Sequence, residues 1–174
     1  MTDHPRRLQA LRAVADGYGA EYAHGEQRPL SGYLALLAGF TALSGGMGAF
    51  VVRRRALPER LPAEDLALLT VATFRLSRLV TKDSVTAVVR APFTRYEEPA
   101  GEGEVNEEVA GTGLRHAVGE LVSCPFCISV WAATGLTFGL VAAPRSTRLV
   151  CSALAAVTGS DALQFAFAAL RRLA

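Results

Sequence analysis

Aromatic residues and net charge are both scarce in this sequence. Only 7% of the 174 residues are aromatic, with a single Trp, and 18 Lys and Arg stand against 16 Asp and Glu. A net charge of +2 argues against a nucleic-acid partner, because nucleic-acid-binding domains carry strongly basic surfaces. Hydrophobic residues nevertheless make up 51% of the chain and are mostly small or aliphatic. This composition favours helices packed closely in lipid over an aromatic-rich soluble core.

Cysteine is rare, and the common catalytic motifs are missing. Three cysteines cannot all pair, so we expect no framework of structural disulfides. The sequence has no Walker loop, Rossmann glycine turn, Ser-His-Asp set or zinc-protease helix, which favours a non-enzymatic protein without excluding an enzyme. Residues 1–29 lack an apolar segment behind their arginines. We interpret them as a polar N-terminal tail and not as a cleavable signal peptide.

Long uncharged runs are what the chain does have. Residues 30–52 contain no charged side chain and are bounded by Arg28 and by the arginines at 53–55. A hydrocarbon layer of about 30 Å needs roughly 20 helical residues, so this run predicts a first transmembrane helix. Its glycines would weaken a soluble helix, but in lipid they let another helix approach closely.

Residues 62–91 follow an amphipathic pattern. At helical spacing Arg75, Arg78 and Lys82 form a basic stripe, and leucines and alanines occupy the opposite face. This pattern predicts a basic amphipathic helix in the membrane interface, with its charges toward anionic lipid headgroups. An extra span with its arginines turned inward is the alternative. The glutamate-rich residues 96–113 that follow predict a solvated acidic loop.

The C-terminal part, residues 114–174, contains two further apolar runs. After a short amphipathic helix, residues 125–143 are uncharged and end at Pro144, and residues 149–170 contain one charge, Asp161. These runs predict a transmembrane hairpin that begins at a Cys-x-x-Cys motif. The predicted fold is therefore all-α: a small polytopic membrane helix bundle with three transmembrane helices plus an amphipathic helical segment.

The distribution of Lys and Arg predicts how this bundle is oriented. With three spans and the amino terminus outside, the inner segments carry twelve Lys and Arg and the outer segments carry six. Lys and Arg prefer the cytoplasmic side of short loops, so we expect the basic helix and the acidic loop in the cytoplasm. A fourth span with the same amino terminus would remove this bias. We therefore predict a multi-pass protein of the cytoplasmic membrane.

Two short motifs resemble a known family. One is Arg-x-x-Arg-Leu followed by an acidic residue, and the other is Glu-Leu followed by Cys-x-x-Cys and Trp. Here they comprise Arg75, Arg78, Leu79, Asp83, Glu120, Leu121, Cys124, Cys127 and Trp131. Over roughly residues 64–143 the chain resembles the bacterial membrane family catalogued as domain of unknown function 1360. That family often has Gly between the second Cys and the Trp, where this chain has none. The resemblance implies a bacterial membrane protein and no particular activity.

Cys124 and Cys127 are the residues with the clearest chemistry. At the start of a helix, free amides and the helix dipole stabilise a thiolate. The pair therefore has the spacing of a redox dithiol or of half a zinc site. Zinc is the only cofactor that the pattern suggests, and it needs about four ligands. Glu120 and His116 lie on roughly the same side and are the further candidates. A purely structural role for both cysteines stays equally open.

Asp161 is the one carboxylate inside a predicted span. Such a residue is costly in lipid and is usually paired or functional. We expect an intramembrane ion pair of Asp161 with Arg75 or Arg78, with a structural role favoured over a proton pathway because one acid provides no relay. Trp131 suits either packing or anchoring at the membrane surface.

These residues together favour a non-enzymatic membrane protein that scaffolds or modulates a partner. The expected partners are the lipid bilayer, anionic headgroups, and either an unidentified protein or a second copy of the chain. The alternative is a membrane thiol redox or zinc-binding protein centred on the Cys-x-x-Cys motif.

Overall fold

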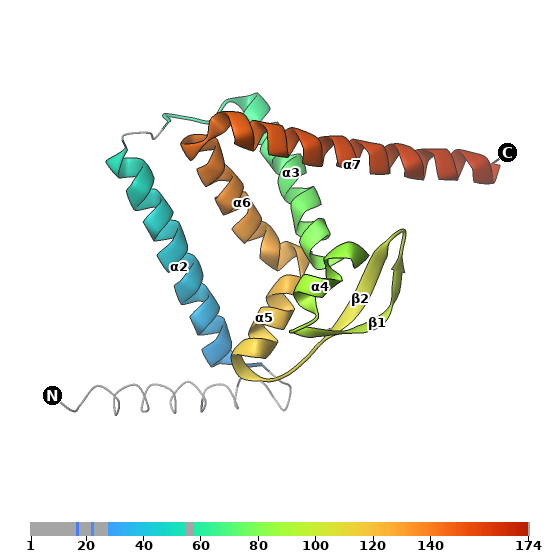
Figure 1. The fold of residues 1–174 in the computed structure, drawn as a ribbon, viewed down its shortest axis with the longest axis horizontal. Coiled ribbons are helices and arrows are strands. Elements are labelled where there is room, and N and C mark those ends of the chain that lie inside the picture. Colours follow the sequence, from blue (N-terminus) through green and yellow to red (C-terminus); the bar gives the residue numbers. More distant parts are fainter. Residues whose placement is uncertain (1–16, 18–21, 23–27, 55–57, 174) are drawn as a thin grey trace.

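The computed structural model describes residues 17, 22, 28–54 and 58–173. Most of the predicted polar tail lies outside these residues. The described chain is mostly helical and has one pair of strands (Figure 1). Its elements are α2 (Leu30–Arg53), α3 (Ala63–Thr81), the 3-10 turn η1 (Ser84–Thr86), α4 (Ala87–Arg90), β1 (Thr94–Gly101), β2 (Glu104–Val109), α5 (Gly113–Ser123), α6 (Pro125–Ala142) and α7 (Pro144–Leu173).

Helix α3 packs along α6, and α2 lies on the opposite side of α6 (Figure 1). Edge-to-face ring pairs join α2 to α6 in the same order along both helices, Phe40 with Trp131 and Phe50 with Phe138. These two helices are therefore parallel. Helix α3 runs the opposite way, because its first turn lies beside the start of α7, directly after α6 ends.

Helices α5 and α6 follow each other directly, and the chain bends between them at Cys124. Cys124 has an extended backbone (φ −103°, ψ 109°), and Pro125 occupies the first turn of α6. Proline disfavours helical geometry in the residue before it and suits the first turn of a new helix. The start of α5 packs closely on the start of α2: a Cβ at Gly32 would lie 2.8 Å from the Cβ of Ala117. The bend thus lets α5 contact α2 while α6 packs on α3.

Helix α7 does not fold back along α6, as the predicted transmembrane hairpin requires. Only Ala143 separates the two helices, too short a link for an antiparallel reversal. Thr147 packs on Gly139 and keeps the two ends close. Helix α7 instead contacts α3 and then projects away from the other elements (Figure 1).

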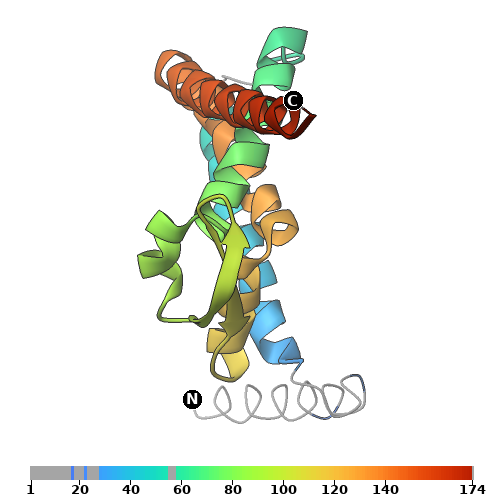
Figure 2. The ribbon, with the colours of Figure 1, turned by 90° about the vertical axis from the view of Figure 1, so that its right-hand side faces the viewer.

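The prediction of an all-α fold is wrong for residues 94–109, which lie mostly in the predicted acidic loop. Strands β1 and β2 pair antiparallel, from Thr94 opposite Val109 to Gly101 opposite Glu104. Gly101, Glu102 and Gly103 have positive φ at the turn, where glycine is favoured. Two glutamates of β2 are neutralised by arginines from α3 and α4, Glu104 by Arg78 and Glu107 by Arg90. These partners favour the strands, and the local sequence does not reveal them. Figure 2 shows this hairpin in front of the helices.

Little apolar surface is buried among these elements. The buried hydrophobic residues are few and small: Val51, Leu69, Ala72, Ala110, Ala117, Leu140 and Cys151. Helices α2, α6 and α7 are long and apolar enough to cross a membrane by length and composition, and hardly any of their apolar residues is buried. The three predicted spans thus coincide with three candidate membrane-spanning helices.

Candidate functional site: an arginine and carboxylate network

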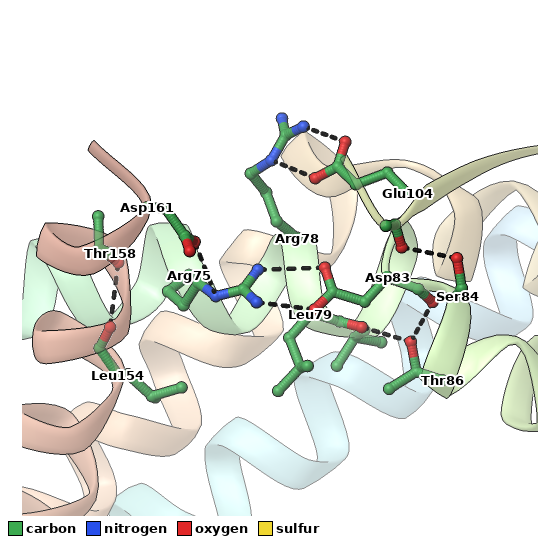
Figure 3. A network of polar contacts seen from close by, with 12 residues as sticks. Arg75, Arg78, Leu79, Asp83, Ser84, Thr86, Glu104, Leu154, Thr158 and Asp161 are labelled. Atoms are coloured by element: carbon green, nitrogen blue, oxygen red, sulfur yellow. Dashed lines mark hydrogen bonds and ion pairs between the residues drawn. The ribbon is translucent and has the colours of Figure 1, made fainter. Parts of the chain in front are cut away.

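The last turns of α3 carry two arginines that each clamp a carboxylate. Arg75 donates two hydrogen bonds to Asp83, at 3.1 and 2.7 Å. Arg78 also donates two, to Glu104 at the start of β2, and its Nε lies 3.0 Å from the carboxylate. Bidentate pairs of this kind are stronger and geometrically more specific than single contacts. Together they fix the end of α3 to the hairpin (Figure 3).

Arg90 is the most completely enclosed charge of the described chain, with 0% of its surface exposed. Its five N–H groups meet five acceptors. Two bonds, at 2.6 and 3.2 Å, go to Glu107. The others go to the carbonyls of Val80 (2.8 Å) and Asp83 (3.1 Å) and to the hydroxyl of Thr86 (2.8 Å). A guanidinium has five donors, so this buried charge is fully satisfied and holds α3, α4 and β2 together.

Backbone contacts complete the junction between α3 and the hairpin. The amide of Val105 donates to the carbonyl of Lys82 at 2.9 Å, and the amide of Ser84 donates to the carbonyl of Gly103 at 2.9 Å. The Thr86 hydroxyl donates to the carbonyls of Leu79 and Asp83 (Figure 3). Each acidic or basic group of the network is therefore already bound to another protein group. The network suits a rigid joint better than acid–base catalysis.

Two ion pairs connect α3 to α7. Arg148 donates two bonds of 2.7 Å to Asp65. Nε of Arg75 lies 3.7 Å from a carboxylate oxygen of Asp161. The structure thus brings Asp161 to Arg75, whereas Arg78 pairs with Glu104 instead. Arg75 is shared between Asp83 and Asp161 (Figure 3).

Glu120 is the centre of a second polar cluster, where α5 meets α2. Its carboxylate accepts a very short hydrogen bond from the Tyr33 hydroxyl and lies 3.3 Å from Arg28. His116 lies 3.7 Å from it, one helical turn away. The structure therefore brings the predicted candidates Glu120 and His116 together, with partners from the start of α2.

Cys124 and Cys127 occupy the first turn of α6. The Cys127 amide lies 3.3 Å from the Cys124 sulfur, so this sulfur caps the helix. Both cysteines are free, and so is the buried Cys151 of α7. Among the described residues no group of three His, Cys, Asp or Glu side chains is gathered as a metal site would need. The four predicted zinc candidates thus do not converge in this arrangement. Trp131, about one helical turn after Cys127 in α6, packs on Phe40 of α2.

The sequence reasoning missed Arg90, Glu104, Glu107 and the Asp65–Arg148 pair. The available signal was weak. Arg90 stands in an apolar stretch, directly after two valines and before Ala91 and Pro92. An arginine is unusual in such a stretch. Its partner Glu107 is 17 residues away, and no helical or strand spacing links the two.

The fold and the site define a class: a mostly helical protein with three candidate membrane spans, in which a further helix, α3, is joined by arginines to an acidic hairpin. The family model described as "Protein of unknown function (DUF1360)" matches residues 68–167. The chain belongs to this family, and the resemblance seen in the two motifs is confirmed. The matched residues include the carboxylate pairs of Arg75, Arg78 and Arg90 and the Cys-x-x-Cys motif, whereas Asp65 lies just before them.

Two proteins of Bacillus subtilis (strain 168) are similar to the chain. It is 34% identical over 93 residues to "Sporulation protein YjcA", covering 52% of this chain and 79% of that one. It is 27% identical over 88 residues to "UPF0713 protein YngL", covering 50% of this chain and 65% of the relative. No solved structure matches.

Proposed function

We propose that this chain is a multi-pass integral membrane protein that acts as a non-enzymatic scaffold in a bacterial cytoplasmic membrane. The observation that carries the proposal is the exposure of the apolar helices α2 and α7, together with the half-buried α6, since hardly any residue of the three is fully buried. Soluble monomers rarely expose large contiguous apolar surface. A lipid bilayer covers the apolar side chains of such helices, and the thickness of its hydrocarbon core matches their length.

The acidic hairpin supplies the surface that a scaffold needs. Arg78 and Arg90 hold Glu104 and Glu107 of its second strand. Four further glutamates are exposed: Glu97, Glu98, Glu102 and Glu108. A rigid, negatively charged projection suits a basic segment of a partner protein, because complementary charge steers and orients association. YjcA carries the name of a sporulation protein, and this proposal extends only to a membrane scaffold.

Extraction of membranes with alkaline carbonate tests the membrane placement. Peripheral proteins are released, and we expect this chain to stay with the lipid and to dissolve only in detergent. Recovery in the soluble fraction would overturn the proposal.

Photo-crosslinking in intact membranes tests the scaffold. A photoreactive residue at Glu98 should give a discrete protein adduct, and the same residue at Leu163 of α7, which is 72% exposed, should give lipid adducts. Replacing the other three exposed glutamates, Glu97, Glu102 and Glu108, with lysine should remove the adduct at position 98. An adduct that survives this reversal of charge contradicts a charge-guided partner.

A thiol protein is the second candidate, favoured by the cap that Cys124 forms on α6. An N-terminal helix position stabilises a thiolate, and Cys127, one turn on, is placed to form a disulfide with it. Redox titration with a thiol reagent tests this candidate. A two-electron transition that disappears in Cys127→Ser supports it, and ordinary, independent thiols contradict it.

A further inference from the structure

The segment from η1 to α4 has its charged and apolar residues reversed relative to a helix in water. Arg90 is wholly buried, whereas Val85, Val88 and Val89 are 78%, 77% and 62% exposed. A surface helix in water turns charge outward and apolar side chains inward. Figure 2 shows this short helix protruding beside the hairpin. The solvent that matches such a surface is hydrocarbon.

Helix α3 shows the same reversal along its length. Asp65 and Arg75 form ion pairs with residues of α7. In contrast, Leu66 and Phe74 are 54% and 52% exposed. The Thr70 hydroxyl, which lies between these two, donates to the carbonyl of Leu66 at 2.8 Å. A hydroxyl satisfied by its own helix needs no water. The outward face of α3 between its terminal charges is therefore apolar.

The length and direction of α3 fit a crossing of the membrane. Its 19 residues extend about 28 Å at 1.5 Å per residue, close to the hydrocarbon thickness of about 30 Å. It runs antiparallel beside α6, a candidate span of 18 residues. Glu64 and Asp65 lie in its first turn and Arg78 in its last. The charges thus lie near its ends, and Arg75, deeper in the helix, is paired.

We infer that α3 crosses the membrane together with α2 and α6, and that the valines of η1 and α4 contact acyl chains where α3 ends. This inference rests on the membrane placement proposed above. It replaces the expected helix on the membrane surface by the alternative of an extra span. The start of α2, the hairpin and Cys124 then share one side. The segment 58–62 and the turn at Pro144 lie on the other. With the hairpin in the cytoplasm, Arg28 and the start of α2 lie there too. This placement reverses the expected orientation of α2 and puts Arg28 on the side that Lys and Arg prefer.

Protease sites inserted singly into the full chain test the sidedness. Positions after Arg28, Glu59 and Glu102 are compared in right-side-out and inside-out vesicles. We expect cleavage after Arg28 and Glu102 from the same face and cleavage after Glu59 from the opposite face. Cleavage after Glu59 and Glu102 from one face overturns the inference, since α3 then does not cross. Cleavage of all three from both faces, with release by carbonate, overturns the membrane placement itself and is thus distinguishable.

Quenching by brominated lipid provides a second test that needs no insertion. Trp131 is the only tryptophan, so the background variant is Trp131→Phe. In vesicles of phosphatidylcholine brominated on its acyl chains, V88W should lose fluorescence. The matched control Y96W, at an exposed position of the hairpin, should keep it. Equal fluorescence of V88W in brominated and ordinary lipid overturns the lipid contact of α4.

Discussion

Two regions of the molecule are stabilised in opposite ways. One is the junction between α3 and the hairpin, and the other comprises the helices α2 and α7. At the junction, Arg75, Arg78 and Arg90 each bind a carboxylate with bidentate or multiple bonds. Along α7 the large apolar residues stand exposed, and ion pairs anchor only part of the helix. The junction thus carries its own stabilising contacts, whereas the bare helices depend on what surrounds them. Substitutions should therefore be costly in the first region and nearly silent in the second.

Removing Arg90 should give the largest effect. In Arg90→Met, Glu107 remains as a nearly buried carboxylate (6% exposed) without its cation. Breaking one side of a buried pair costs about 3–5 kcal/mol. Denaturant unfolding in detergent micelles, followed by circular dichroism, measures the loss. The matched control is Arg95→Met, an exposed arginine of β1, which should change the unfolding free energy by less than about 0.5 kcal/mol. Similar losses in both variants would contradict the special role of Arg90.

Gly119 of α5 should come next. A Cβ there would lie 2.6 Å from Val109 and 2.8 Å from the carbonyl oxygen of Phe93. Because a backbone atom cannot simply rotate away, Gly119→Ala should destabilise by about 1–3 kcal/mol. Gly135→Ala is the control, since nothing lies within 4 Å of a Cβ at that position of α6. If the two variants unfold alike, α5 is not pressed against the hairpin as described.

The same contrast explains what the sequence could and could not predict. The limits of α2 and α6 follow from uncharged runs that end at arginines or prolines, so the residues 30–52 and 125–143 nearly match Leu30–Arg53 and Pro125–Ala142. These signals are local. The hairpin was misread because Glu104 is neutralised by an arginine 26 residues earlier. Without that partner, a run of glutamates indicates a solvated loop.

The candidate site was visible from the sequence only in part. Arg75, Arg78, Leu79 and Asp83 are marked by a motif, but a motif does not tell which carboxylate each arginine binds. Asp161 was noticed because a lone charge in an apolar run is costly. In the sequence, Asp65 has only the features of an ordinary acidic residue in a first helical turn. Its pairing with Arg148 depends on the direction in which α7 leaves α6, which a one-residue link leaves undetermined in the sequence.

The contact between α3 and α7 should contribute less to the stability than the contacts of Arg90 and Gly119, and lowering the pH should reveal this contribution. Arg148 binds the ionised carboxylate of Asp65 through two hydrogen bonds. Protonation removes the negative charge that Arg148 binds, so the stabilisation is present at neutral pH and is lost as the carboxylate is protonated in acid. Asp65→Asn should therefore unfold more easily than the native chain at neutral pH, and the two should converge at low pH. A difference that is constant with pH would mean that the carboxylate charge is not what holds the helices together.

Leu163 of α7 should show almost no effect. Its side chain is 72% exposed and meets detergent or lipid in both the native and the unfolded chain, so truncation leaves no cavity. Leu163→Ala should change the unfolding free energy in micelles by less than about 0.5 kcal/mol. Leu69→Ala, at a 7% exposed position of α3, is the comparison and should lose about 2–5 kcal/mol, because a buried cavity remains. A large loss in Leu163→Ala would instead mean that the projecting half of α7 is covered by protein, and a second copy of the chain in the micelle, detected by its mass, would then be the first candidate for that cover.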